Sequence, residues 1–157
     1  MTDAAPAPAA ELSDEQILAR FQSSTRHSPG TRLLGFRMLA VRQAEMTVEV
    51  AFDGAADRFA NPMGQIQGGF VCAMLDEAMS VSVLVASKMT CAAPTLEMKT
   101  SFLRPAMPGV LRGVGRVVKW GRTIAFTEGE LYDEAGRLLA KATGTAMPTP
   151  FSNFKKT

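Results

Sequence analysis

Histidine and cysteine are scarce in this chain of 157 residues, which has one histidine and two cysteines. Zinc sites built on several histidines are therefore excluded, and His27, Cys72 and Cys91 show no recognisable metal-ligand spacing. The two cysteines form neither a CxxC pair nor a disulfide framework. His27 stands in a polar loop beside proline and glycine, which favours a loop residue over the base of a Ser-His-Asp triad. We expect neither a metal nor a cofactor.

The chain also lacks an excess of one charge, since 17 basic and 15 acidic residues leave a net charge of +2. Without a basic block beyond the pair at 155–156, nucleic acid is not expected as a partner. Residues 1–10 lack the basic segment and leucine-rich run of a signal peptide, so the cytoplasm is the expected location. We expect one domain over 13–148, a disordered tail over 1–12 and a C-terminal tail over 149–157.

Two segments have helical patterns. Ser13 with Gln16 three residues later forms a capping-box pattern that predicts a helix over 13–23. The segment 69–86 is apolar or small on all sides, which is typical of a buried helix. Only Asp76 and Glu77 within it are charged, and each would cost about 2.5–3.5 kcal/mol in lipid, so we expect no membrane contact.

The remaining pattern is that of strands, two before the long helix and four after it. Residues 46–52 alternate between apolar and other residues with a period of two, as in a sheet. The predicted strands are 33–41, 46–52, 95–103, 110–120, 123–132 and 138–147. The last of them has one face of mostly small residues, as expected where a helix lies close. The pattern predicts an α+β fold, a six-stranded antiparallel sheet wrapped around a central helix. Because the sheet covers only part of that helix, we expect at least a homodimer.

The start of the long helix and its acid are the candidate site. Gly68 and Gly69 leave backbone N–H groups approachable at the positive end of the helix dipole, where an oxyanion could be held. A tight turn that needs glycine is the alternative. Asp76, in an apolar helix, is either a general base or nucleophile in a cleft, or the partner of a buried group. Along a helix, Gly69 and Asp76 are about 10 Å apart. A site that uses both must be shared between antiparallel helices of two subunits and occur twice per dimer.

These residues resemble those of a known family. Asn61, Gly64 and Gln67-Gly68-Gly69, followed by the acid, are similar to the pattern Asn-x-x-Gly-x-x-His-Gly-Gly of the hotdog-fold acyl-CoA thioesterases of the phenylacetate-pathway (PaaI-like) type. The resemblance extends over about residues 33–148 through the later strands and the closing hairpin. It implies a hotdog fold and hydrolysis of an acyl-CoA thioester to a free acid and coenzyme A. It leaves the acyl chain open, as well as the choice between coenzyme A and acyl carrier protein.

The resemblance also implies roles for single residues. The side chain of Asn61 and the N–H of Gly69 would bind the thioester oxygen. Asp76 of the facing subunit would activate water or attack directly, and Thr95 would position that water. The homodimer is expected to pair into a dimer of dimers.

The substrate-binding residues implied by the resemblance are Gln67, Gly68 and Arg122, of which Arg122 would meet the phosphates of coenzyme A. Lys119 and Arg104 are further candidates for that contact.

One position departs from the family pattern, because Gln67 replaces its histidine. Both side chains form hydrogen bonds, but glutamine cannot titrate, so we expect Gln67 to orient the loop. A hotdog hydratase or dehydratase is one alternative, although no histidine lies near the helix. A non-enzymatic acyl-CoA binding or sensing protein is the other, and Gln67 keeps it open.

Overall fold

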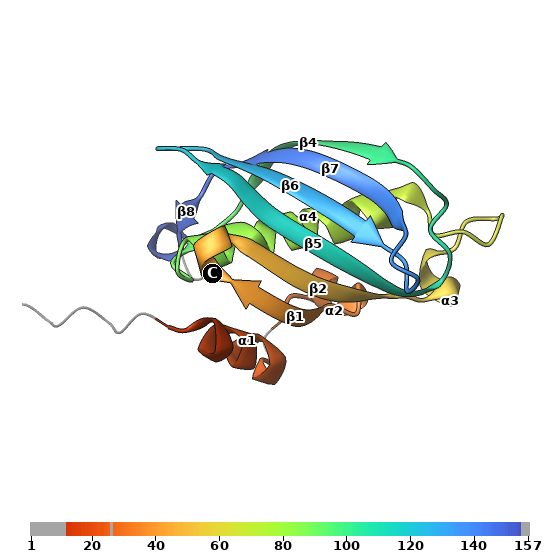
Figure 1. Cartoon of the computed structure of the whole chain (residues 1–157), viewed down its shortest axis with the longest axis horizontal. Coiled ribbons are helices and arrows are strands. Elements are labelled where there is room, and N and C mark those ends of the chain that lie inside the picture. The colour runs from red at the N-terminus through yellow and green to blue at the C-terminus, as the bar shows by residue number, and fades with distance from the viewer. Residues whose placement is uncertain (1–11, 26, 155–157) are drawn as a thin grey trace, which may run out of the picture.

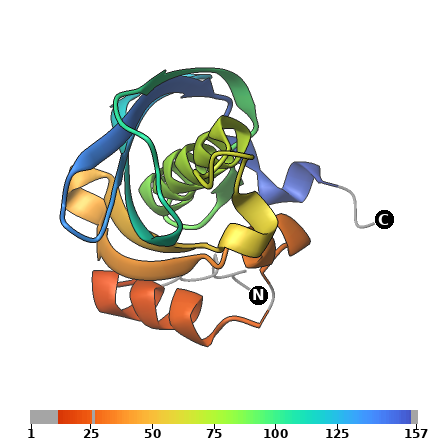
Figure 2. The same ribbon diagram turned by 90° about the vertical axis from the view of Figure 1, so that its right-hand side faces the viewer.

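The computed structural model describes residues 12–25 and 27–154 and contains a six-stranded antiparallel sheet in the order β1-β2-β5-β6-β7-β4. The sheet curls around one long helix, α4 (Gly68–Ala86), as Figures 1 and 2 show. Its strands are β1 (Arg37–Arg42), β2 (Thr47–Gly54), β4 (Thr95–Phe102), β5 (Gly109–Trp120), β6 (Ala125–Tyr132) and β7 (Leu138–Ala146). The predicted α+β architecture is therefore confirmed.

The N-terminal helix α1 (Asp14–Ser23) packs against β1 on the outside of the sheet (Figure 2). It begins as predicted, because Ser13 Oγ accepts a hydrogen bond from the backbone N–H of Gln16, and the Gln16 side chain accepts one from the backbone N–H of Ser13. This reciprocal cap holds the first turn of α1 in place.

A short helix, α2 (Pro29–Leu33), corrects the predicted strand over 33–41, which begins only at Arg37. Ser28 Oγ accepts a hydrogen bond from the N–H of Thr31, and proline at the first helical position lacks an N–H that would need a partner. The segment therefore closes into a helical turn. A second short helix, α3 (Ala56–Phe59), lies between β2 and α4.

The helix α4 lies directly on small residues of the sheet. A Cβ at Gly115 would lie 2.0 Å from the carbonyl oxygen of Ala78, and one at Gly129 would lie 3.1 Å from Met79 Cγ. Gly115 pairs with Gly129, and Gly129 pairs with Ala142, so a row of small residues crosses three strands beneath α4. The expectation of a small face on the last strand is confirmed, since Ala142 is buried there.

The same helix is long and apolar enough to cross a membrane and is the one such helix in the described part of the chain. Half of the 18-residue apolar stretch of this helix is buried inside the protein, as in a core helix. Asp76 and Glu77 lie partly exposed near its middle. Its place inside the sheet agrees with the prediction of a buried helix.

The C-terminal segment is better anchored than the sequence predicts. The strand β8 (Thr149–Pro150) pairs with β3 (Cys91–Ala92), and the N–H of Phe151 donates to the carbonyl oxygen of Thr90 at 3.1 Å. A one-turn 3-10 helix, η2 (Phe151–Asn153), follows. These backbone hydrogen bonds attach the start of the expected C-terminal tail over 149–157 to the rest of the fold. Residues 1–11 of the expected N-terminal tail (1–12) and residues 155–157 of the expected C-terminal tail (149–157) lie outside the described residues.

One side of α4 is not covered by the sheet. Gly69 is exposed there, and Ala73, Asp76 and Ser80 are partly exposed. The neighbouring strand β4 is an edge of the sheet that pairs with β7 alone, and its Phe102 side chain is 56% exposed. An uncovered helix beside an edge strand with exposed Leu96 and Phe102 is a surface that a second subunit could cover.

Candidate functional site

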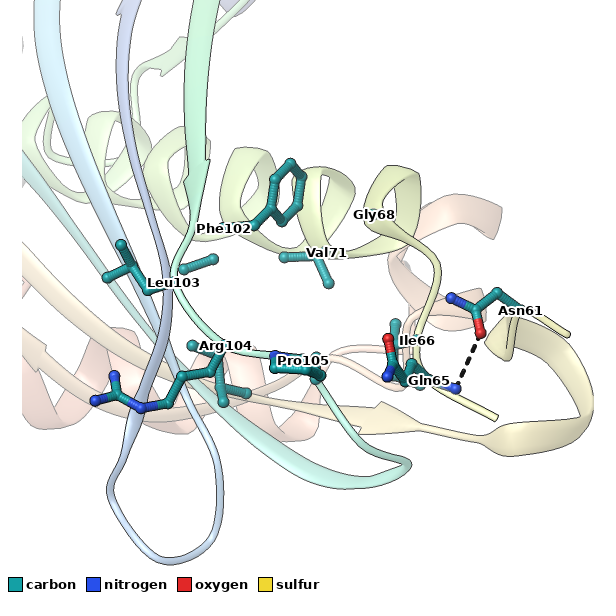
Figure 3. Close-up of a pocket in the computed structure, with 12 residues that line it drawn as sticks. Asn61, Gln65, Ile66, Gly68, Val71, Phe102, Leu103, Arg104 and Pro105 are labelled. Atoms are coloured by element: carbon teal, nitrogen blue, oxygen red, sulfur yellow. Dashed lines mark hydrogen bonds between the residues drawn. The ribbon is translucent and has the colours of Figure 1, made fainter. Parts of the chain in front are cut away.

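The loop before α4 fixes the orientation of the Asn61 side chain. Asn61 Oδ1 accepts hydrogen bonds from the N–H groups of Met63 at 2.9 Å and Gln65 at 3.1 Å. Gly64, with a φ of +75°, closes this turn in a conformation that favours glycine. Because the oxygen accepts two hydrogen bonds, the amide nitrogen of Asn61 remains as a donor beside the start of α4 (Figure 3).

Gln67 is the residue that caps α4, and it does so through its backbone. Its N–H donates to the carbonyl oxygen of Phe59 at 2.8 Å, and its own carbonyl oxygen accepts from Phe70 at 2.9 Å. The Gln67 side chain is exposed and forms no hydrogen bond within residues 12–25 and 27–154. The backbone, rather than the side-chain amide, therefore holds this loop.

The two glycines at the helix start have different surroundings. A Cβ at Gly68 would lie 3.2 Å from Phe102 Cζ, so the ring of Phe102 would have to move by a few tenths of an ångström to admit a side chain there. A Cβ at Gly69 would meet only Gln67 Oε1, at 3.9 Å. Neither N–H has an acceptor among the residues that the structure describes. The N–H of Gly69 is thus open to a molecule that approaches the helix end.

A cavity of about 360 Å³ lies beside this helix start (Figure 3). Asn61 and Gly68 form one side of it, and the segment from Phe102 to Ala106 forms the other. The side chain of Arg104 extends from its wall and donates to the carbonyl oxygen of Leu138 at 2.8 Å. The cavity therefore combines amide donors, apolar side chains and one cation.

Asp76 and Thr95 are brought together as a pair. Thr95, the first residue of β4, donates a hydrogen bond from Oγ1 to Asp76 Oδ1 at 2.7 Å. Asp76 is partly buried and Thr95 is exposed, so the pair is accessible from the uncovered side of α4. Within one protomer, Asp76 lies two helical turns from Gly69, about 10 Å along α4. The structure of one chain does not place this acid at the helix start.

Glu77, the next residue, has a different environment. Thr31 Oγ1 donates to Glu77 Oε1 at 3.0 Å, across 46 residues of chain. Burial raises the pKa of the Glu77 carboxyl above its ordinary value, and the neighbouring Asp76 charge raises it further. The Thr31 hydrogen bond and the charge of His27 act in the opposite direction. Sequence reasoning did not single out Thr31, although Ser28-Pro29 is a recognisable helix start.

Arg122 lies away from this group of residues. It follows β5 in the turn to β6, at the end of the sheet where Val117 and Ala125 pack against Val83 in the second half of α4. Figure 1 shows that this end is opposite to the start of α4. Within one protomer, the cation at the Asn61 cavity is Arg104.

His27 lies in the loop between α1 and α2, as expected of a loop residue. Its ring packs edge-on against Phe36, with ring centres 5.8 Å apart. Within residues 12–25 and 27–154, no three histidine, cysteine or acidic residues gather in a group that could hold a metal ion.

A central helix wrapped by an antiparallel sheet, with open N–H groups at the helix start, defines a hotdog-fold protein. The model of the thioesterase superfamily matches residues 63–140. A structure from Ralstonia eutropha JMP134, described as a candidate thioesterase related to phenylacetic acid degradation, is 34% identical, covers 83% of this chain and 98% of its own, and has a TM-score of 0.75. The chain belongs to the thioesterase superfamily.

Two further relatives extend this result. A Streptococcus mutans UA159 protein, solved with acetyl-CoA bound, is 27% identical over 73% of this chain and 89% of its own, with a TM-score of 0.63. A protein of Saccharolobus solfataricus named as a candidate esterase is 25% identical over 114 residues, which are 73% of this chain and 79% of that protein.

Proposed function

We propose that this protein is an acyl-CoA thioesterase that hydrolyses an acyl-CoA thioester to a free acid and coenzyme A. The observation that carries the proposal is the Asp76–Thr95 pair, on the same helix whose first N–H groups are open. Membership of the thioesterase superfamily supports it, as does the acetyl-CoA bound to the relative from Streptococcus mutans.

In the proposed reaction, the thioester oxygen accepts hydrogen bonds from the N–H of Gly69 and the amide nitrogen of Asn61. Both donors are held before the substrate arrives, because the backbone of Gln67 and the Asn61 turn are hydrogen-bonded in place. Such preorganised donors, together with the helix dipole, stabilise the negative charge that develops on the oxygen. Gln67 and Gly68 complete this binding surface.

Asp76 then acts on the water that attacks the carbonyl carbon. The carboxylate takes a proton from water, the new C–O bond forms, and the C–S bond breaks as the coenzyme A thiolate leaves and takes up a proton. Thr95 occupies one oxygen of Asp76, which leaves the other for water, and the Thr95 oxygen can accept a hydrogen bond from the same water. In the second route, Asp76 attacks the carbonyl carbon itself, and the C–S bond breaks as the coenzyme A thiolate leaves and takes up a proton. Water then hydrolyses the resulting anhydride to the free acid and the Asp76 carboxylate.

The proposed site is shared between two subunits. Because Gly69 and Asp76 are about 10 Å apart in one helix, a second α4 in antiparallel orientation must bring Gly69 of one protomer to Asp76 of the other. The uncovered side of α4 supports a homodimer, and such dimers would pair into a dimer of dimers. Arg104, at the cavity, and Arg122, from the far end of the sheet, are the candidate contacts for the phosphates of coenzyme A.

The experiment that tests the proposal is a thiol-release assay over aliphatic and aromatic acyl-CoA esters of increasing size. Replacing Asp76→Ala should lower kcat by about 10² or more while the protein remains folded, as expected on loss of a general base. Asp57→Ala is the matched control, since that side chain is 84% exposed on α3. A folded Asp76→Ala variant with the wild-type rate would remove Asp76 from the mechanism.

A non-enzymatic acyl-CoA binding protein on the same fold is the second candidate. Gln67, which cannot titrate, is the residue that favours it. Calorimetric binding of acyl-CoA esters without release of thiol from any of them would support this candidate over the enzyme.

A further inference from the structure

A second hollow borders α4 and shares no lining residue with the Asn61 cavity. It is a groove of about 250 Å³ between α2 and α4. Leu33 and Leu34 form its wall on the α2 side, and Phe70 and Ala73 form its wall on α4. Asp76 also lines the groove, so this apolar surface begins at the proposed catalytic acid.

The groove has a polar end built from buried or partly buried side chains. Thr31 Oγ1 donates to Glu77 Oε1 at 3.0 Å and lies 2.8 Å from Ser28 Oγ, with which it shares a hydrogen bond. Burial raises the pKa of the Glu77 carboxyl, which indicates a poorly hydrated environment. Within the described residues, Glu77 accepts a hydrogen bond from Thr31 but forms no ion pair, so a group that enters the groove meets a carboxyl without a salt-bridge partner.

The position of Asp76 determines which part of a substrate can occupy this groove. The carbonyl carbon must reach the water held by Asp76, and the acyl group extends from that carbon on the side opposite to sulfur. The Asn61 cavity, by contrast, is lined by Asn61 and Arg104 but not by Asp76, which suits the coenzyme A arm of the substrate. The acyl group therefore has the α2–α4 groove as its apolar path.

We propose that the α2–α4 groove binds the acyl group of the substrate, and that Leu33, Ala73 and Glu77 select short, uncharged acyl groups. Leu33 on the α2 side and Ala73 on α4 both line the groove, so the bulk of these two side chains limits what it admits. Glu77 disfavours acyl groups that end in a carboxylate, because two like charges repel in a poorly hydrated site. This inference rests on the proposed thioesterase function and names the substrate class of that site.

Substitutions at Leu33 test the size limit, because this side chain is 47% exposed and its replacement should leave the fold intact. Leu33→Trp should lower kcat/KM for the longest acyl chain that the wild type hydrolyses by about tenfold relative to the shortest, and Leu33→Ala should move the preference toward longer chains. Ala73→Leu narrows the groove from the opposite wall. Leu39→Trp and Leu39→Ala, at a residue 44% exposed on β1, are the matched controls. Equal changes across all chain lengths in the Leu33 and Ala73 variants would overturn the proposal.

Glu77→Gln tests the charge preference, since glutamine keeps the acceptor for Thr31. The ratio of kcat/KM for succinyl-CoA to that for butyryl-CoA should rise about tenfold, and an unchanged ratio would remove Glu77 from selection. Calorimetric binding of the same esters is measured in parallel. If the affinity of the wild type for the acyl-CoA esters depends on acyl length but no thiol is released, the thioesterase proposal is refuted and the groove proposal is supported. A wild type that hydrolyses the series with no response to Leu33 or Ala73 refutes the groove alone.

Discussion

At the scale of single residues, two adjacent acids on α4 have unlike surroundings. Asp76 receives a hydrogen bond from Thr95 at the exposed start of an edge strand, whereas Glu77 receives one from the buried Thr31 and is itself partly buried. The helix turns successive side chains by about 100°, so neighbours in sequence point to different walls. Asp76 therefore has one hydrogen-bond partner on the edge strand β4, whereas Glu77 is held by Thr31 at the polar end of the α2–α4 groove.

The pKa of Glu77 leads to a prediction about stability. Burial raises this pKa in the folded state above the ordinary value of 4.5. The contribution of Glu77 is therefore most favourable below pH 4.5 and is lost as the pH rises through the folded-state pKa. Glu77→Gln removes the charged form, so this variant should have a higher Tm than the wild type at about pH 8, and the difference should shrink toward about pH 4.

Thermal unfolding followed by circular dichroism across this pH range checks the prediction. Glu97→Gln, at an exposed position of β4, is the control and should show no such trend. A Glu77→Gln protein that is less stable than the wild type at the higher pH would contradict it.

A second prediction concerns Gln67, which takes the place of the family's histidine. Because the backbone of Gln67 already holds the loop, Gln67→His should change kcat by much less than the 10²-fold or more of a general acid or base. The thiol-release assay measures this directly. A gain of about 10² or more would show instead that an imidazole carries chemistry at this position.

At the scale of elements, the distance between α4 and the sheet depends on residues without side chains. Gly115 and Gly129 form a cross-strand pair beneath the helix, and Gly115 lies against the backbone at Ala78. A backbone carbonyl cannot rotate away as the end of a flexible side chain can. This contact therefore fixes how α4 is placed on β5, and so it also fixes the position of Asp76 on that helix.

The third prediction is that Gly115→Ala strongly destabilises the protein. Its Cβ would lie 2.0 Å from the Ala78 oxygen, so the helix must shift, at a cost of at least the 1–3 kcal/mol typical of overpacking. Gly30→Ala is the matched control, because its Cβ would meet only Ser28 Oγ at 3.8 Å. Urea unfolding of both variants gives the two free energies, and equal values would refute the close contact.

At the scale of the whole molecule, the uncovered face of α4 and the free edge of β4 lie on one side. They carry Asp76, Thr95 and the exposed ring of Phe102. Gly69 and Asp76 lie about 10 Å apart along one helix, so under the proposed mechanism a single chain holds the halves of two sites rather than one whole site. Association would complete the chemistry as well as bury apolar surface.

The fourth prediction is complementation between inactive variants. Asp76→Ala and Asn61→Ala should each lower the rate by about 10² when present in every chain. A mixed dimer of the two has one intact site, made of Asn61 from one chain and Asp76 from the other. Co-expressed, doubly tagged mixed dimers should therefore recover about half of the wild-type rate per dimer, whereas a site within one chain would recover none.

The sequence predicted the elements with strong local patterns. The alternation over 46–52 corresponds to β2, and the apolar run from 69 to 86 corresponds to α4. The predicted strand over 33–41 was wrong at its start, because α2 is only five residues long and too short for a periodic signal. The strand β8 was missed because it pairs with β3, a two-residue strand more than fifty residues away.

What the sequence determined by itself is local: the periods that form α4 and the strands, and the order of Asn61, Gly69 and Asp76 along one loop and one helix. Hydrophobic periodicity and helix geometry involve only residues close in sequence, so both can be recognised before the tertiary structure is known. Only the tertiary structure placed Thr31 on Glu77, across 46 residues, and so formed the α2–α4 groove. Contacts at such separations depend on how the whole chain packs around α4, which no local pattern encodes.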